Sequence, residues 1–181
     1  MYNKADPFTP VSVPLLALCL TGLLLLGTPG SVSLYGQPPK ATANNELKIN
    51  AVYLLAGFPE FSYERILGEE TAAGVSVGFA LDDSFGLNFG MFPYYRLFFG
   101  KKRAAGFFVE GNGALYSESL DLDGRDTSKL GAGVGLAIGG KFLTKGGWVA
   151  ELYAGAGRNF VNTDDLSAAY PRFGIHIGKR F

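Results

Sequence analysis

The sequence predicts an all-β fold, an eight-stranded antiparallel up-and-down transmembrane β-barrel with a polar, glycine-rich interior. Three observations support this prediction. Apolar residues alternate with small or polar ones over most of the chain after residue 45, which is the pattern of strands whose two faces meet different surroundings. Short and longer connections alternate between the strand segments. Aromatic residues gather where these segments end, as they do at the two interfaces of a membrane barrel.

The composition is that of a β protein in an apolar environment. Of the 181 residues, 48% are hydrophobic, which excludes a disordered chain, and only 18% are charged, below the roughly 25% of a typical soluble domain. The formal net charge is zero, so no basic field exists to attract nucleic acid. The only cysteine, Cys19, lies in the N-terminal apolar run, and the expected mature chain therefore has neither disulfides nor a cysteine metal site.

The N-terminal region is predicted to be an export signal. An uncharged apolar run, residues 11–27, follows Lys4, and small residues come after it, which is the order found in a secretory signal peptide. We expect cleavage at the small residues around Val32 or after Gly36. A retained transmembrane anchor is the alternative, although proline and glycine interrupt this short run. The predicted divisions of the chain are a signal peptide, a linker and the barrel domain, at residues 1–36, 37–45 and 46–181.

Eight segments carry the alternation, and each is about as long as a tilted strand must be to cross a bilayer. In the sixth, Val134, Leu136 and Ile138 alternate with small residues. Residues 51–58 are apolar on both faces, so the pattern leaves the register of the first hairpin open. Pro93 predicts a bulge in the fourth segment, because proline removes a ladder hydrogen bond. The predicted strands are residues 46–54, 61–67, 74–81, 87–99, 107–115, 131–139, 148–155 and 172–180.

The connections predict that both termini lie on the periplasmic side, because the number of strands is even. All seven aspartates after residue 45 fall in the longer connections, as expected of loops in water. Short turns are expected at residues 68–71, 100–103 and 145–147, and longer outer loops at residues 82–86, 118–128 and 159–169.

Alternation alone leaves open which face is outside, because a soluble lipid-binding barrel has the same pattern around an apolar interior. Two features favour lipid outside: the polar face is rich in glycine and poor in charge, and aromatic residues flank the turns. In addition, the chain ends in Phe181, with Phe173, Ile175 and Ile177 on the same face. This ending resembles the C-terminal signal that the outer-membrane assembly machinery reads, and Lys179 departs from it.

A set of strand charges faces the interior on this register. Buried ions need partners, so we expect Arg96 to pair with Glu110, and Glu151 to pair with Arg172 or His176. An eight-stranded interior is about one side chain wide, which predicts a packed polar core rather than an open pore. The predicted interior network is Glu64, Arg96, Glu110, Lys141, Glu151, Arg172, His176 and Arg180.

Five motifs carry a family resemblance: Phe61-Ser62-Tyr63-Glu64-Arg65, Phe92-Pro93-Tyr94-Tyr95-Arg96, Gly140-Lys141-Phe142, Glu151 with Gly155-x-Gly157-Arg158-Asn159-Phe160, and Tyr170-Pro171-Arg172 continuing to Phe181. In these motifs the chain resembles a family of uncharacterised small outer-membrane β-barrel proteins, a domain of unknown function. The resemblance covers residues 47–181. It implies the barrel fold and a location in the cell outer membrane of a Gram-negative bacterium, and it implies no activity and no catalytic residues.

A lipid-modifying enzyme is the main alternative, since outer-membrane lipid deacylases and acyltransferases are also eight-stranded barrels. They resemble hydrolases in needing a serine nucleophile with a histidine base. Here His176 is the only histidine, and although Ser62 and Ser76 could face inward, their spacing places neither beside it. We therefore expect no catalytic residues.

No metal or cofactor is expected either. Residues 121–126 resemble part of a calcium loop, but they lack the closing glutamate. The sequence thus predicts a structural or interaction barrel that is not an enzyme. Its expected partners are outer-membrane lipids, lipopolysaccharide and the outer-membrane assembly machinery. A lipid-modifying enzyme and a soluble lipid-binding barrel remain the alternatives.

Overall fold

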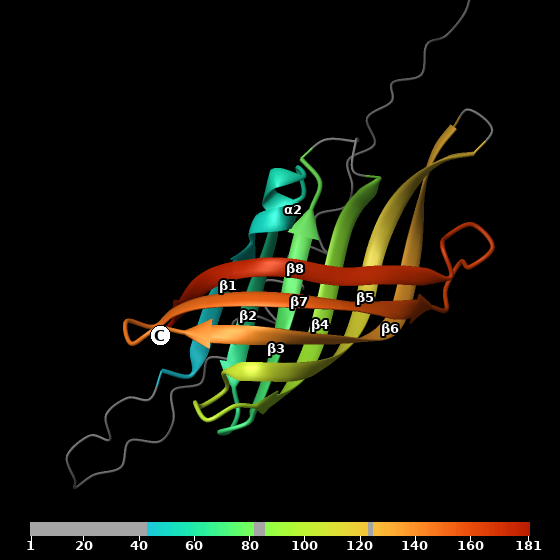
Figure 1. Ribbon diagram of the computed structural model, residues 1–181. Helices are drawn as coiled ribbons and strands as arrows, with labels where there is room; N and C mark the ends of the chain where they lie inside the picture. The colour runs from blue at the N-terminus through green and yellow to red at the C-terminus, as the bar shows by residue number, and fades with distance from the viewer. Residues whose placement is uncertain (1–42, 82–85, 123–124) are drawn as a thin grey trace, which may run out of the picture. The chain divides into compact units, whose positions relative to one another are not determined.

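The computed structural model of the protein describes residues 43–81, 86–122 and 125–181. The predicted signal peptide (1–36) and most of the predicted linker (37–45) lie outside the described residues. Eight antiparallel strands form one closed barrel, in which each strand pairs with its neighbours in sequence and β1 pairs with β8 (Figure 1). The all-β, eight-stranded fold is therefore confirmed. The elements are β1 (Asn45–Asn50), α2 (Ala51–Leu55), β2 (Glu60–Ile66), β3 (Thr71–Phe79), β4 (Leu87–Phe99), β5 (Gly106–Leu122), β6 (Arg125–Leu143), β7 (Trp148–Asn159) and β8 (Ala169–Arg180).

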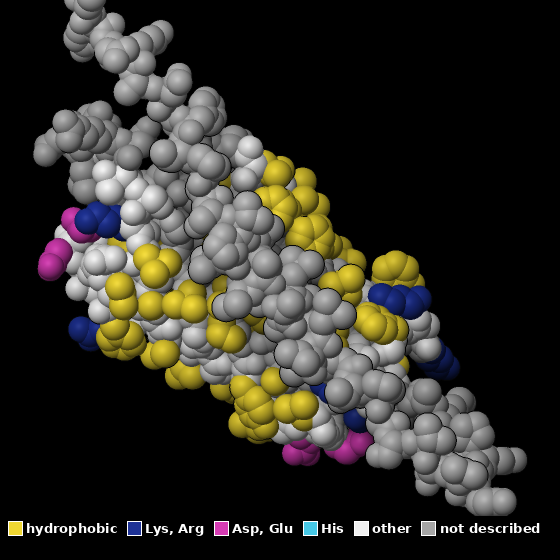
Figure 2. All heavy atoms as spheres, turned by 180° about the vertical axis from the view of Figure 1, so that it is seen from behind, with side chains coloured by type: hydrophobic (Ala, Val, Ile, Leu, Met, Phe, Trp, Pro, Cys, Tyr) yellow, Lys and Arg dark blue, Asp and Glu magenta, His cyan; other side chains and the backbone are white. Residues whose placement is uncertain are grey.

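The exposure of the side chains follows the alternation in the sequence. Leu136 and Leu152 project from the outer wall and are 68% and 61% exposed, whereas Arg96 and Glu110 face inward and are fully buried. Figure 2 shows hydrophobic side chains spread over the described surface of one side of the barrel, with charged side chains mainly near its ends. Among the described residues no helix is long and apolar enough to span a membrane, a finding that does not address crossing by strands.

The first hairpin differs from the predicted strand over residues 46–54. β1 ends at Asn50, whose side-chain oxygen accepts hydrogen bonds from the backbone N–H groups of Val52 (3.2 Å) and Tyr53 (3.4 Å) and so caps α2. Gly57, with a φ of 83°, ends the helix in the left-handed region. A local cap and a glycine stop thus replace the expected strand by a helix, which is why the apolar residues here follow no single strand face.

The hairpin of β5 and β6 is longer than predicted. Residues 118–128 were expected to form a loop, and the ladder instead continues to the pair Leu122↔Arg125. Ser117 and Ser128, whose hydroxyl oxygens lie 2.6 Å apart, belong to this extension. Polar residues can continue the hydrogen-bonded ladder of two strands after the apolar part of the hairpin has ended. The residues typical of turns in 118–128 therefore did not mark the ends of β5 and β6.

Pro93 does not produce the predicted bulge. It stays in register opposite Val75 of β3, and the irregularity in β4 lies between Leu87 and Phe89. The pairs on either side of Pro93 keep one register with β5. A single missing N–H donor is therefore tolerated here because the ladder is intact before and after it.

Candidate functional site

The barrel interior holds a dense set of charged side chains. Among the described residues, five carboxylates and five cations are at most 9% exposed, so their formal charges cancel when His176 is neutral. The buried charged residues are Glu46, Lys48, Glu60, Glu64, Arg96, Glu110, Lys141, Glu151, Arg172 and Arg180, and His176 is buried with them. We call these eleven residues the interior network. They include all eight residues that the sequence analysis places in the interior.

Glu64 and Glu151 form the centre of this interior network. Nζ of Lys48 lies 2.7 Å from an oxygen of each carboxylate. Nη1 of Arg96 lies 2.7 Å from Glu64 and 2.9 Å from Glu151. Lys141 also contacts both carboxylates. Three cations therefore share two carboxylates, so removing either carboxylate would leave like charges close together in a buried site.

Three carboxylates are close enough to suggest a metal site. One oxygen each from Glu46, Glu64 and Glu151 lie within 4.8 Å of one another. The ammonium groups of Lys48 and Lys141 supply the positive charge there, with Nζ of Lys48 2.7 Å from Glu64 and Nζ of Lys141 2.8 Å from Glu46. The arrangement is therefore a cluster of ion pairs, and we assign no metal to it.

The cross-strand pair of Arg96 and Glu110 is present. The two residues are register partners on β4 and β5, and Nε of Arg96 donates to Oε2 of Glu110 at 2.8 Å. Nη2 of Arg96 lies 2.8 Å from the same oxygen without forming an aligned hydrogen bond. Arg172 lies 3.3 Å from the other oxygen of Glu110 and 3.2 Å from Glu60. Glu110 therefore joins the two arginines into one network.

His176 lies where four interior side chains meet. Its Nδ1 is 3.3 Å from Oε2 of Glu151, so of the two partners expected for this glutamate the histidine is the one found in contact. Its Nε2 is 3.2 Å from Oε1 of Glu60. The same nitrogen lies 3.4 Å from Oγ of Ser62 and 3.4 Å from the hydroxyl oxygen of Tyr153. Because a neutral imidazole has a single N–H, it can donate to only one of these two carboxylates, whereas a protonated ring could donate to both.

The contact between Ser62 and His176 could not be predicted from their spacing in the sequence. Ser62, His176 and Glu151 stand in the order of nucleophile, base and acid that serine hydrolases use. Both Ser62 and His176 are fully buried, and Oγ of Ser62 lies 2.6 Å from Oγ of Ser76. A substrate would have to displace the packed interior to reach this serine, so the geometry favours a structural hydrogen-bond network.

Aromatic rings fill the space between the charged groups. The guanidinium carbon of Arg96 lies 4.3 Å from the ring centre of Phe108 and 4.4 Å from that of Tyr94. Inward-facing glycines make room for these rings: a Cβ at Gly74 would overlap Tyr94, and a Cβ at Gly139 would overlap Phe108. The interior around Arg96 is therefore packed rather than hollow.

Three charged members of the network were not among the predicted residues. Glu46 and Lys48 lie in β1 and Glu60 begins β2, so all three belong to the first hairpin, whose register the pattern left open. The signal was nevertheless present, because Glu60 and Glu64 are four residues apart and thus share one face of a strand.

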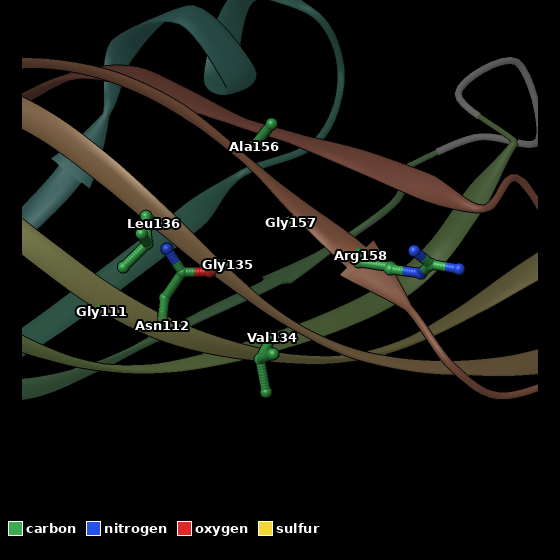
Figure 3. A pocket seen from close by; sticks show the side chains of 8 residues that line it. All are labelled: Gly111, Asn112, Val134, Gly135, Leu136, Ala156, Gly157 and Arg158. Atoms are coloured by element: carbon green, nitrogen blue, oxygen red, sulfur yellow. The ribbon is translucent and has the colours of Figure 1, made fainter.

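A shallow hollow of about 630 Å³ lies over β5, β6 and β7. Figure 3 shows Asn112 and Val134, two of its lining residues, pointing to opposite sides of the sheet. Gly111 places no side chain on the outer wall there, and no heavy atom lies within 4 Å of a Cβ built at this position. Arg158 is the one charged residue in the described lining. The lining is thus mostly small and apolar, and it brings no nucleophile beside a base.

The C-terminus closes the barrel. The N–H of Phe181 donates to the carbonyl oxygen of Asn45 at 2.8 Å, and the N–H of Asn45 donates back to Phe181 at 3.0 Å. The ring of Phe181 is 58% exposed, on the same outward side as Phe173 and Ile177. The side chains of residues 121–126, which resemble part of a calcium loop, lie outside the described residues.

These features define the protein as a closed eight-stranded antiparallel β-barrel with an ion-paired interior and an apolar outer wall. In comparisons with known proteins, no family model matches the chain, and neither a curated protein nor a solved structure matches it significantly. The resemblance to small outer-membrane barrels of unknown function therefore stays a prediction.

Proposed function

We propose that the protein is a structural or interaction β-barrel of the Gram-negative outer membrane, exported by its N-terminal signal and without enzymatic activity. The observation that carries this proposal is the distribution of charged and apolar side chains between the inside and the outside of the barrel. Charges that balance one another are buried inside, while large apolar side chains such as Phe142 (70% exposed) and Trp148 (57% exposed) cover the wall. A soluble lipid-binding barrel has the opposite arrangement, and an exposed apolar surface of this kind is stable only against lipid or another protein.

The lengths of β3 to β8 support a membrane location, whereas β1 and β2 are shorter, with 6 and 7 residues. β4, β7 and β8 have 13, 12 and 12 residues, slightly more than the roughly 9–11 that a tilted strand needs to cross the hydrocarbon core. Phe99 and Phe107 are neighbours at one end of the barrel, with ring centres 6.1 Å apart, and Phe160 is exposed at the other end. Aromatic residues at both ends suit the two membrane interfaces. The proposed partners are outer-membrane lipids, lipopolysaccharide and the outer-membrane assembly machinery.

Heat treatment offers a first test of the membrane barrel. We expect the unboiled protein to migrate differently from the boiled protein on a denaturing gel, because a closed barrel with a paired interior resists detergent at room temperature. The protein should also stay in the membrane fraction during carbonate washing and require detergent for release. Release by carbonate alone would contradict the proposal.

A lipid-modifying enzyme is the second candidate, because Ser62, His176 and Glu151 are in contact. Burial argues against it: a hydrolytic nucleophile must reach its substrate, and Ser62 and His176 are both fully buried. The histidine is also within reach of Glu60 and Tyr153, which suits a structural role.

The variants His176→Ala and Ser62→Ala separate these two candidates. We expect the acylation of lipid A in the native host to be unchanged by either substitution, provided that the barrel keeps its heat-dependent gel mobility. Mass spectrometry of extracted lipid A provides the measurement, with Ser119→Ala at an exposed site as the matched control. The loss or gain of an acyl chain in either interior variant, but not in the control, would establish the enzyme instead.

A further inference from the structure

The seam between β1 and β8 is only partly paired. β1 pairs with β8 from Asn50↔His176 to Glu46↔Arg180, and the chain then turns into α2. The other half of β8 pairs with β7 on one side but has no β1 partner in the described part of the chain. Pro171 lies in this half, where a missing N–H donor is tolerated. The carbonyl of Phe173 there accepts a hydrogen bond from the side chain of Asn50 at 3.4 Å.

The short helix α2 lies against this unpaired edge. The ring of Tyr53 packs edge-on against Phe173, with centroids 5.3 Å apart and planes 73° apart. Because a helix lies where strand pairing would otherwise continue, a cavity of about 360 Å³ remains between α2, β8 and the interior faces of β4 and β5. We call it the mouth cavity. Its lining includes Tyr53, Phe92, Tyr116, Glu118, Tyr170 and Phe173.

The lining of the mouth cavity is rich in aromatic residues. Five of the lining residues are aromatic, and Glu118 is the only charged one among the described residues that line the cavity. Two cations adjoin it but are held by other carboxylates. Lys129, the register partner of Glu118, lies 2.9 Å from Asp165. The guanidinium carbon of Arg172 lies 5.1 Å from the ring centre of Phe92, and this arginine is paired with Glu60. The lining therefore combines aromatic faces with an acidic group.

Aromatic rings and a carboxylate together suit a positively charged ligand. Aromatic rings attract cations through the negative potential of their faces, and alkylated ammonium groups suit such sites because little hydration is lost. A carboxylate beside the rings adds preference for positive charge.

We propose that the mouth cavity binds a hydrophobic organic cation, an alkylated ammonium group whose hydrocarbon chain leaves over the unpaired edge of β8. The head lies among Tyr116, Tyr170 and Phe92, close to Glu118. The chain follows Phe173 toward the apolar outer wall. A volume of about 360 Å³ is at the lower end of the range for small-molecule sites, which suits a trimethylammonium group with part of its chain. Binding at this site requires the cavity only, and it goes beyond the proposed role of the barrel.

The first test compares three probes that share a hexyl chain and differ in charge. Hexyltrimethylammonium, hexanol and hexyl sulfate are titrated into the purified protein in a non-ionic detergent, with calorimetry as the readout. We expect the cation to bind at least about tenfold more tightly than either of the others, because cation–π and charge contributions act together. Equal affinity for hexanol, or tighter binding of hexyl sulfate, would overturn the proposal. This test needs only the unmodified protein.

The second test locates the site. Glu118→Gln and Tyr116→Leu should each weaken binding of hexyltrimethylammonium by about fivefold to tenfold. Glu70→Gln, an exposed acid in the turn at the other end of the barrel, is the matched control and should leave the affinity unchanged. Heat-dependent gel mobility checks that each variant is folded. Unchanged affinity in both cavity variants, or an equal loss in the control, would show that the cation binds elsewhere.

Discussion

Replacing Arg96 with methionine is expected to destabilise the folded barrel by about 3–5 kcal/mol, because breaking a buried ion pair from one side leaves uncompensated charge. Arg96 contacts Glu64, Glu110 and Glu151, and all four side chains are buried. The interior would change from a neutral set of charges to a net negative one. Urea unfolding of the protein in lipid vesicles measures the free energy of unfolding.

A double-mutant cycle isolates the pair. Arg96→Met combined with Glu110→Gln restores neutrality, so the double variant should be more stable than Arg96→Met alone, and the cycle should give a clear coupling energy. Arg65→Met is the matched control, since this arginine is exposed on the outer wall and its loss should change stability by no more than about 0.5 kcal/mol. Additive effects of the two interior substitutions would mean that Arg96 and Glu110 do not interact, and a large loss in the control would point to a general effect of removing arginine.

Replacing Gly155 with alanine should cost about 1–3 kcal/mol or more, because small-to-large changes in a packed interior force neighbouring atoms to move. A Cβ at Gly155 would overlap the carbonyl oxygen of Leu136 and the Cα of Ala137 on the neighbouring strand. These are backbone or backbone-attached atoms of the barrel wall, so no side-chain rotation can relieve the contact. The urea midpoint and the fraction of heat-modifiable protein provide the measurements.

Gly111→Ala is the control for this prediction. It is the same substitution in a strand of the same barrel, but it faces outward and meets no atom within 4 Å. Alanine there should leave stability unchanged or raise it slightly, because it reduces the freedom of the unfolded chain. Similar losses at Gly111 and Gly155 would show that the effect arises from the strand backbone and not from lack of space in the interior.

Local pattern in the sequence determined the strands and their faces. A period of two places residues such as Leu136 and Leu152 outside and Glu64, Arg96 and Glu110 inside, because successive side chains of a strand point to opposite faces. Neighbouring strands in an up-and-down barrel follow one another in sequence. The contact between Arg96 and Glu110 could therefore be predicted from the two adjacent segments alone.

The tertiary structure alone decided contacts across the interior and at the first hairpin. Ser62 meets His176 because β1 pairs with β2 on one side and with β8 on the other, so that Ser62 lies opposite Lys48 and His176 lies opposite Asn50. The pairing of β1 with β8 closes the barrel between distant parts of the chain, so no local pattern encodes its register. The helix after Asn50 depends on a side chain that caps α2 and also bonds Glu60 and the carbonyl of Phe173 on β8. Apolar residues on both faces of a short segment fit either a strand or a helix, so the choice rested on these long-range partners.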